Sequence, residues 1–234
     1  MRGVRLINGG KPMQKGAKSL KLLKQLDEHL RDMNVAWHLC GGFAIDLFLG
    51  KETREHKDLD ITVSFDEMEV CIDYLKAKGW RIIAPVGKGR CVPIEYALSS
   101  NTLYFDNIWC YREGAEFIKT LSVEGPYEYL EMVDRVQQDL DFIEVLFNKV
   151  EKGRFYYLKN PEIHREIDKA FVEIENISVL SPEIILLYKT RNPGNADYRQ
   201  DFALALAELQ QDSRKWLEEA MKTEYPEGHP WRVK

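Results

Sequence analysis

The chain has 234 residues, of which 44% are hydrophobic and 30% charged, and its 33 lysines and arginines against 38 acidic residues give a net charge of −5. This length can bury a substantial core, as one large domain or two small ones. The acidic balance argues against a broad nucleic-acid surface, which needs a basic face, although a local basic pocket for a triphosphate remains compatible with it. No apolar stretch approaches membrane-spanning length, and the basic N-terminus lacks the apolar core of a signal peptide.

The cysteines indicate a reduced environment. The four of them show neither C-x-x-C spacing nor a metal-ligand pattern, and Cys40 and Cys71 stand in apolar settings. Free cysteines are among the most often buried residues, so we expect buried free thiols. These observations predict a cytoplasmic protein without a membrane segment.

The beginning of the chain predicts an arm, a helix and a strand. Residues 1–18 are basic and lack periodicity, which predicts a loose arm. Residues 19–33 carry apolar side chains at helical spacing, with charged residues on the opposite face. We expect this helix to cover a sheet whose first strand begins at Val35.

A glycine pair follows this strand. The apolar run Val35–Leu39 leads to Gly41 and Gly42, and residues 43–49 then form an apolar segment that Gly50 ends as a helix C-cap does. A Gly-Gly turn that opens a helix can present backbone N–H groups and the positive end of the helix dipole to a phosphate. The pair could also serve only as a tight turn.

Two aspartates lie on one face of the next predicted strand. Alternation over residues 58–63 places Asp58, Asp60 and Thr62 on one face and apolar residues on the other. Neighbouring carboxylates repel each other, and a divalent cation neutralises that repulsion. The glycine pair and the aspartates together suggest a metal–nucleotide site, although the acids could also lie exposed at a strand edge.

These features form one ordered string, G-G-F-A-I-D-L-F-L-G-x(3)-R-x-H-x-D-L-D-I, from Gly41 to Ile61. The string resembles the signature of the small-molecule nucleotidyltransferases in the DNA polymerase beta superfamily, most of all the aminoglycoside adenylyltransferase-like branch, with the lincosamide enzymes nearby. A lone D-x-D occurs by chance in many strands, whereas the ordered set is specific. The resemblance spans roughly residues 20–232. It implies an α+β fold, with a small mixed polymerase-beta-like sheet, flanking helices and a C-terminal helical bundle.

Helices and strands continue beyond the aspartates. The pattern predicts a helix over residues 66–78, a strand over 80–84, a turn at Gly87–Gly89 and a β-prone aromatic segment at 102–111. Residues 127–138 predict a further helix. The alternation of helix and strand up to this point fits a mixed α/β sheet.

Residues 113–139 form a longer segment than the resemblance leads us to expect, which predicts an insertion. Its acids could attract a polycationic acceptor, or they could form only the solvated face of a helix. These acids are Glu124, Glu128, Glu131 and Asp134.

A third acid is predicted on the strand at residues 141–147, which is apolar apart from Glu144. An acid enclosed in this way needs a partner or a function. Polymerase-beta-type sites use a third carboxylate on a strand next to the Asp-x-Asp strand, and the resemblance places Glu144 near that position, as a metal ligand or general base. Asp141 is the second choice and Asp106 the third, and a paired core acid is the alternative for Glu144.

The last third of the chain predicts helices. Ser181 stands at an N-cap with Pro182 at the first helical position, and further helices are expected over residues 197–210 and 212–221. The string P-E-I-x-L-L-Y-K ends at Lys189 and matches the family, where the lysine is expected near the nucleotide's phosphates. A salt bridge is the alternative for this lysine.

Two segments depart from the family pattern. The predicted strand at residues 155–158 is followed by Lys159 and Asn160, where the family usually has paired arginines and an acid. Residues 195–199 replace the usual lysine and aspartate before Asp201. The chain is thus expected to consist of a loose arm, a nucleotidyltransferase core and a helical region, at residues 1–18, 19–174 and 175–234.

Three further residues of the string have supporting roles in this prediction. Arg54 is expected to contact phosphate or to anchor its loop, because it precedes His56 and Asp58. His56 is expected to organise the loop by hydrogen bonding rather than to carry protons. Asp46 is expected to pair with Arg54 or to support catalysis.

The resemblance implies an enzyme that moves a nucleoside monophosphate, foremost AMP from ATP, onto a hydroxyl of a small aminoglycoside-like molecule and releases pyrophosphate. Asp58, Asp60 and Glu144 would hold one or two Mg²⁺ ions, and Gly41, Gly42, Arg54 and Lys189 would bind the triphosphate. Such a reaction depends mainly on positioning and charge neutralisation. A protein- or tRNA-modifying nucleotidyltransferase of a toxin–antitoxin type and a non-catalytic nucleotide-binding protein are the alternatives, and the oligomeric state stays open.

Overall fold

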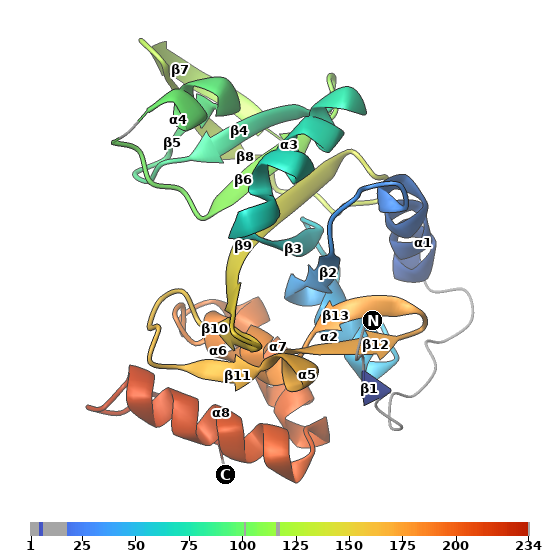
Figure 1. Ribbon diagram of the computed structural model, residues 1–234, viewed down its shortest axis with the longest axis vertical. Helices are drawn as coiled ribbons and strands as arrows, with labels where there is room; N and C mark the ends of the chain where they lie inside the picture. Colours follow the sequence, from blue (N-terminus) through green and yellow to red (C-terminus); the bar gives the residue numbers. More distant parts are fainter. Residues whose placement is uncertain (1–4, 7–17, 101, 116–117, 234) are drawn as a thin grey trace. The chain divides into compact units, whose positions relative to one another are not determined.

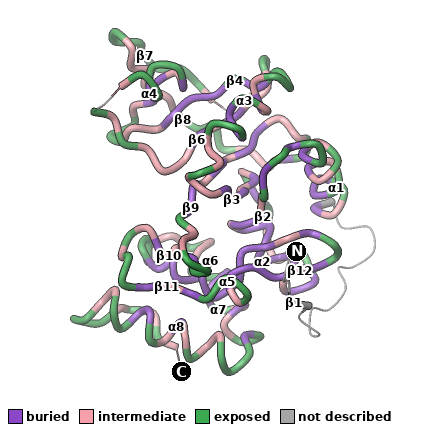
Figure 2. The backbone as a smooth tube through the Cα atoms, viewed as in Figure 1, coloured by how far each residue is buried: buried purple, intermediate pink, exposed green. Residues whose placement is uncertain are grey.

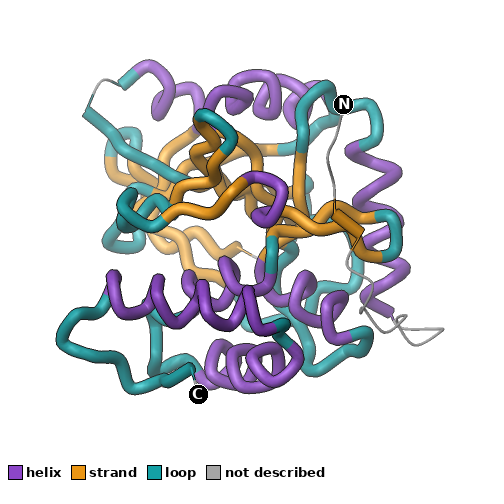
Figure 3. Tube along the Cα trace, turned by 60° about the horizontal axis from the view of Figure 1, so that its bottom comes forward, coloured by secondary structure: helices purple, strands orange, loops and turns teal. Residues whose placement is uncertain are grey.

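The computed structural model describes residues 5–6, 18–100, 102–115 and 118–233 (Figure 1). This part of the chain contains both helices and strands, in agreement with the predicted α+β class (Figure 3). The described residues form two compact units, of which unit 1 comprises those within 5–20, 38–54 and 148–233 and unit 2 comprises those within 21–37 and 55–147. Most of the predicted arm lies outside the described residues, and the predicted division at residues 18 and 174 stays a prediction.

Unit 1 contains a set of four paired strands, a second set of three antiparallel strands and the C-terminal helices. Its strands are β1 (Arg5–Leu6), β2 (Trp37–Cys40), the end of β9 (Phe142–Glu151), β10 (Arg154–Tyr156), β11 (His164–Glu166), β12 (Phe171–Ile174) and β13 (Ile177–Leu180). Its helices are α2 (Gly41–Leu49), α5 (Ile167–Ala170), α6 (Pro182–Lys189), α7 (Ala196–Glu208) and α8 (Gln211–Glu224).

The strands of unit 1 pair in both directions. β1 and β12 are parallel, β12 and β13 are antiparallel, and β13 runs parallel to β2 with Val179 opposite Leu39. The last residues of β9 pair antiparallel with β10, which pairs antiparallel with β11. Gly41 therefore directly follows a strand, β2, that is paired with β13.

Helices α2 and α6 form the interior of unit 1. Both are buried along most of their length, because both are apolar on nearly every side (Figure 2). Gly50 ends α2 in the left-handed conformation, with φ of 69°, and its N–H bonds the carbonyls of Asp46 and Leu47. The predicted helix and its glycine C-cap are thus confirmed. Helix α6 begins at Pro182 as expected, but the Ser181 hydroxyl donates to the Lys169 carbonyl instead of capping the helix.

Unit 2 consists of one sheet with helices packed on it. Its helices are α1 (Lys18–Leu30), most of which lies in this unit, the 3₁₀ turn η1 (Phe65–Glu67), α3 (Met68–Ala77) and α4 (Ile94–Ser99). Its strands are β3 (Asp60–Ser64), β4 (Arg81–Pro85), β5 (Arg90–Pro93), β6 (Asn107–Tyr111), β7 (Ile118–Glu124), β8 (Tyr127–Met132) and the first part of β9.

The strand order in unit 2 is β3-β9-β6-β4-β5-β8-β7 (Figure 1). The pairs from β9 to β7 are all antiparallel. Strands β9 and β6 are central, and the buried residues Ile108, Cys110, Ile143 and Val145 come from them. The polar residues that these two strands carry are therefore held in a rigid setting.

The helix predicted at residues 127–138 is wrong. Residues 127–132 form β8, which pairs with β5 through Tyr129 opposite Arg90 and with β7 through Leu130 opposite Thr120. Tyrosines favour strands, and a strand here satisfies the backbone hydrogen-bonding groups along the otherwise open side of β5. The apolar spacing of the segment was compatible with a helix, and the tertiary pairing decided against it.

All four cysteines are buried and free. The prediction of buried free thiols is confirmed. Burial raises the pKa of Cys71 and of Cys91 to about 12, and nearby acids add to both shifts.

Candidate active site

Three carboxylates meet in unit 2, where β3 lies next to β9. Asp60 begins β3, Asp58 lies in the loop just before that strand, and Glu144 comes from the middle of β9. The Glu144 N–H donates to the Leu59 carbonyl at 2.9 Å. One carboxylate oxygen of each acid lies within 4.8 Å of the others. Among the described residues this is the one cluster of three or more acids, histidines or cysteines close enough to share a metal ion.

The environment of Glu144 disfavours its charge. Burial and, as a smaller effect, the neighbouring charge of Asp58 together raise the pKa of this carboxyl to about 7. The side chain of Asn107 donates a hydrogen bond to Glu144 Oε1 and opposes the shift. A buried carboxyl whose pKa is raised by a neighbouring acid is characteristic of a site where a bound cation neutralises the repulsion.

The other two candidates for the third carboxylate lie in different surroundings. Asp141 accepts two hydrogen bonds from the guanidinium of Arg135, at 2.6 and 2.7 Å, and so belongs to a local ion pair. The charge of Asp106 also raises the pKa of Glu144, but Asp106 is not in the three-acid cluster. The first choice made from the sequence is therefore the one that the fold brings to the aspartates.

The loop that leads to Asp58 is tied to the segment before β9. His56 is buried, and its carbonyl accepts a hydrogen bond from the Gln137 N–H at 2.8 Å. Lys57 forms an ion pair with Asp134. The Gln137 side chain in turn donates to the Phe142 carbonyl at 2.7 Å. Asp134 and Gln137 thus hold the backbone around His56 in place.

In unit 1 the glycine pair opens α2. Gly41 has φ of 68°, a left-handed conformation that favours glycine, and Gly42 is buried. Cys40 stands at the N-cap position, and in the described part of the chain its side chain makes no capping hydrogen bond. The first N–H groups of α2 therefore start from a turn without a side-chain cap, as an anion-binding helix end does.

Asp46 lies on α2 and is fully buried. Its Oδ1 accepts hydrogen bonds from the Thr53 N–H at 3.0 Å and from the Thr53 hydroxyl at 2.5 Å. The charge of Asp46 is also one of those that raise the pKa of Arg54. Asp46 thereby folds the loop after α2 back onto the helix.

Arg54 and Lys189 share one acid of α7. Arg54 Nε and Nη2 donate to the two carboxylate oxygens of Asp201 at 3.1 and 2.9 Å, and Lys189 Nζ lies 2.8 Å from Asp201 Oδ2. Burial lowers the pKa of Arg54, but the hydrogen bond and charge of Asp201 outweigh it, so that the net shift is upward. Unit 1 thus brings together two cations that were predicted to bind phosphate.

Comparison with known proteins points to one family of transferases. Residues 22–137, just under half of the chain, match the family model described as aminoglycoside-2''-adenylyltransferase. This part of the chain is therefore similar to the aminoglycoside adenylyltransferases.

The chain is also similar to a lincosamide resistance protein from Staphylococcus haemolyticus, which is 35% identical over 65 residues. That match covers 28% of this chain and 38% of the relative, so it spans well under two thirds of the relative's length.

Two solved structures share the fold. One is the solution structure of the antibiotic-resistance factor ANT(2'')-Ia, with a TM-score of 0.51, 14% identity, and coverage of 89% of this chain and 93% of that one. The other is the crystal structure of ANT(2'')-Ia with adenylyl-2''-tobramycin, with a TM-score of 0.52, 15% identity, and coverage of 89% and 99%. Both support the predicted nucleotidyltransferase fold.

The acids of residues 124–134 are largely engaged by side chains of the same chain. Arg81 binds Glu128 at 2.9 Å, Lys57 binds Asp134, and the Tyr129 hydroxyl donates to Glu124 at 3.3 Å. Because these acids lie on strands and a loop, the solvated helix face expected for them does not exist. Arg81 and Lys57 thus neutralise two of the four acids.

Two residues of the site were missed from the sequence. Asn107 touches Glu144, and the only sequence signal was its place in the β-prone segment opposite an isolated acid. Asp201 holds Arg54 from 147 positions away. A buried acid within the apolar face of the last helices was the available signal, but sequence alone cannot pair it with a particular cation.

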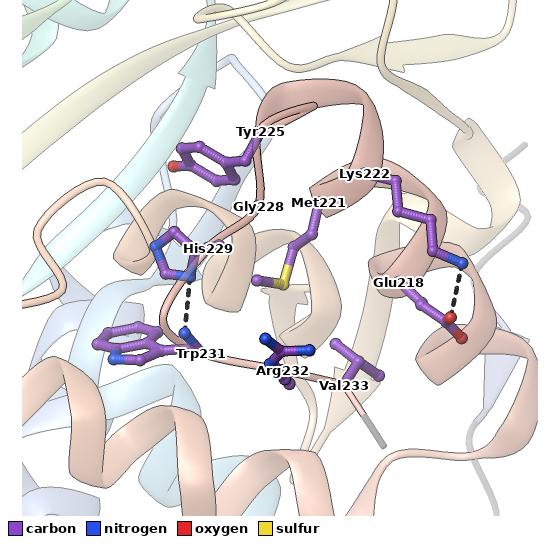
Figure 4. A pocket seen from close by; sticks show the side chains of 9 residues that line it. All are labelled: Glu218, Met221, Lys222, Tyr225, Gly228, His229, Trp231, Arg232 and Val233. Atoms are coloured by element: carbon purple, nitrogen blue, oxygen red, sulfur yellow. Dashed lines mark hydrogen bonds and ion pairs between the residues drawn. The ribbon is translucent and has the colours of Figure 1, made fainter.

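A separate pocket of about 260 Å³ lies in unit 1 between α8 and the C-terminal residues (Figure 4). His229 shapes it, since its Nε2 lies 2.9 Å from the Thr190 carbonyl while its Nδ1 accepts the Trp231 N–H at 3.0 Å. The proton of the neutral ring is therefore on Nε2. No predicted site residue lines this pocket.

None of the described helices combines the length and apolar character needed to cross a membrane.

Proposed function

We propose that this chain transfers a nucleoside monophosphate, foremost AMP from ATP, to a hydroxyl of a small antibiotic-like molecule and releases pyrophosphate. The observation that carries the proposal is the convergence of Asp58, Asp60 and Glu144 within 4.8 Å. The family match and the names of its relatives, which concern aminoglycosides and lincosamides, support an antibiotic acceptor.

The donor set suits a magnesium ion. Three carboxylates supply hard oxygen ligands, which Mg²⁺ prefers, and no cysteine or histidine competes in the cluster. The repulsion that raises the pKa of Glu144 would be relieved by a bound divalent cation. We therefore assign one or two Mg²⁺ ions to these acids, where the metal would neutralise the charge of the phosphates.

The protein's own groups then position the reactants. We assign the N–H groups at the Gly41–Gly42 start of α2 to a phosphate of the nucleotide, because they lack a side-chain cap in the described chain. The acceptor oxygen forms a bond to the α-phosphorus while the bond to the bridging oxygen breaks, and pyrophosphate leaves with that electron pair. We assign the hydroxyl proton to Glu144, because a carboxylate beside the two aspartates is placed to accept it.

Pyrophosphate release tests the proposal. The purified chain would be incubated with Mg²⁺, each of ATP, GTP, CTP and UTP, and a panel of aminoglycosides and lincosamides, and the products weighed by mass spectrometry. We expect acceptor-dependent pyrophosphate and a monophosphate adduct on the acceptor, both abolished by EDTA and by Asp58→Asn. Absence of pyrophosphate with every pair of nucleotide and acceptor would refute the proposal. In a parallel incubation with labelled nucleotide, transfer of the label to added protein or tRNA would show that the acceptor is a macromolecule instead of a small molecule.

A further inference from the structure

Asp201 is a fully buried acid at which three segments of unit 1 meet. It lies on α7 and contacts Arg54, from the loop after α2, and Lys189, from the last turn of α6. The cations keep the pKa of Asp201 below its usual value against the opposing effect of burial. The acid is therefore ionised at neutral pH and holds both cations by charge.

The two cations are enclosed by these contacts. The guanidinium of Arg54 grips both oxygens of Asp201, and its side chain is 15% exposed. Lys189 is 7% exposed and lies between the Asp201 carboxylate and the face of the Tyr198 ring, whose centre is 4.4 Å from Nζ. A bidentate arginine–carboxylate pair is among the strongest and most directional of protein contacts.

The two cations are surrounded by more acids than cations. Asp197, at 3.8 Å, and Asp46 act on Arg54 in addition to Asp201. Three acids thus stand against two cations, with a formal sum of −1. A phosphate-binding pocket requires surplus positive charge, so this cluster resembles an internal tie more than an anion site.

Further hydrogen bonds extend the tie to α2. Thr53, next to Arg54, bonds Asp46 of α2, and the Gln200 side chain of α7 donates to the Thr53 carbonyl at 2.9 Å. Helix α2 also packs against α6 and α7. The loop after α2 is therefore fastened to α7 at two consecutive residues.

We infer that Asp201 is a positioning residue for the proposed transfer, and that it makes Arg54 and Lys189 anchors of α2 and its loop rather than phosphate ligands. The inference rests on the proposed function and decides between two roles that the sequence left open for both cations. Asp201 fixes the helix whose first N–H groups are assigned to the nucleotide.

Steady-state kinetics of three variants test this inference. Asp201→Asn is expected to lower kcat between about tenfold and a hundredfold, as small misplacements of reacting groups do, with the KM for ATP changed less than about threefold. Glu208→Gln is the matched control, because this acid is exposed at the end of the same helix and is not one of the acids around Arg54. It should leave kcat and KM unchanged.

A variant that lacks all three charges of the cluster keeps the test decisive if Asp201→Asn does not fold. The combined variant Arg54→Met, Lys189→Met, Asp201→Leu removes the whole cluster, and replacement of a complete buried ionic group by apolar residues is often neutral or stabilising. We expect it to fold and to keep the KM for ATP within about threefold of the wild type.

The outcomes separate the two proposals. A tenfold or greater rise of the KM for ATP in the combined variant would show that Arg54 or Lys189 binds phosphate and would overturn the inference. An Asp201→Asn variant that folds and retains its kcat would overturn it as well. Wild-type protein without any turnover would instead refute the proposed function.

Discussion

The side-chain amide of Asn107 donates a hydrogen bond to the carboxylate of Glu144, across the antiparallel pair β6 and β9. This hydrogen bond favours the ionised form of Glu144, whereas burial and the charge of Asp58 favour its protonated, neutral form. The neighbouring strand therefore adjusts the charge of the proposed third metal ligand. The balance between these opposing effects leads to predictions for stability and for metal binding.

Removing the charge of Glu144 should stabilise the metal-free protein. In EDTA at pH 8, Glu144→Gln is expected to raise the free energy of unfolding by roughly 1 kcal/mol, because it removes a repelled, desolvated carboxylate. Urea denaturation measures the change. Glu151→Gln, at the exposed end of the same strand, is the control and should have no effect. A Glu144→Gln variant less stable than the wild type in EDTA would contradict the picture of a repulsive cluster.

Asp60→Asn should remove the response to magnesium. We expect Mg²⁺ with ATP to raise the thermal midpoint of the wild type, since a ligand that binds only the folded state stabilises it. The variant should retain at most the part of the shift that ATP produces in EDTA. Asp66→Asn, an exposed acid just beyond the same strand, should respond like the wild type. Equal magnesium shifts in all three proteins would rule out Asp60 as a ligand.

Magnesium binding should strengthen as the pH rises through about 7, the pKa of Glu144. The proton and the cation compete for one carboxylate, so affinity grows as the acid ionises. Asn107→Ala removes a hydrogen bond that lowers this pKa and should move the midpoint to higher pH, whereas Asp106→Asn removes a charge that raises it and should move the midpoint lower. Calorimetric titration between pH 6 and 8 measures both, and shifts in the same direction would contradict the assignment.

Stability should also decrease in mild acid because of His29. Its Nε2 accepts a hydrogen bond from the Trp80 indole at 2.7 Å, and burial, Arg112 and Lys78 lower its pKa below 6.5. The folded state therefore holds the neutral ring, and its stabilising effect is complete above pH 6.5 and is lost as the pH falls through the lowered pKa. Denaturant unfolding from pH 8 to 5 should show this decline, and His29→Gln should reduce its slope. An unchanged slope in the variant would assign the decline to other groups.

The cysteines should be unreactive in the folded protein. Burial raises the pKa values of Cys71, Cys91 and Cys110, so that little thiolate is present at neutral pH. A thiol reagent such as DTNB should label fewer than one thiol in the native protein within minutes and all four in guanidinium chloride. Rapid native labelling would show that at least one of these thiols is accessible.

Local patterns predicted much of the fold correctly. Helix α2 with its glycine cap, the strand that bears Asp60 and the buried strand around Glu144 all follow from periodicity and turn residues, because each depends on neighbours in sequence. The helix expected at residues 127–138 failed for the complementary reason. Its residues suited either state, and the open side of β5, a feature of the tertiary fold, selected the strand.

By itself, the sequence determined the order of the glycine turn, the two aspartates and the isolated Glu144, and with it the resemblance to the adenylyltransferases. Residue types and spacings are local properties, and a specific string records them directly. Only the tertiary structure decided that Glu144 rather than Asp141 lies beside Asp58 and Asp60. It also decided that Asp201 forms ion pairs with Arg54 and Lys189. Those choices depend on which strands and helices become neighbours, since an ion pair forms between charges close in space, whatever their separation along the chain.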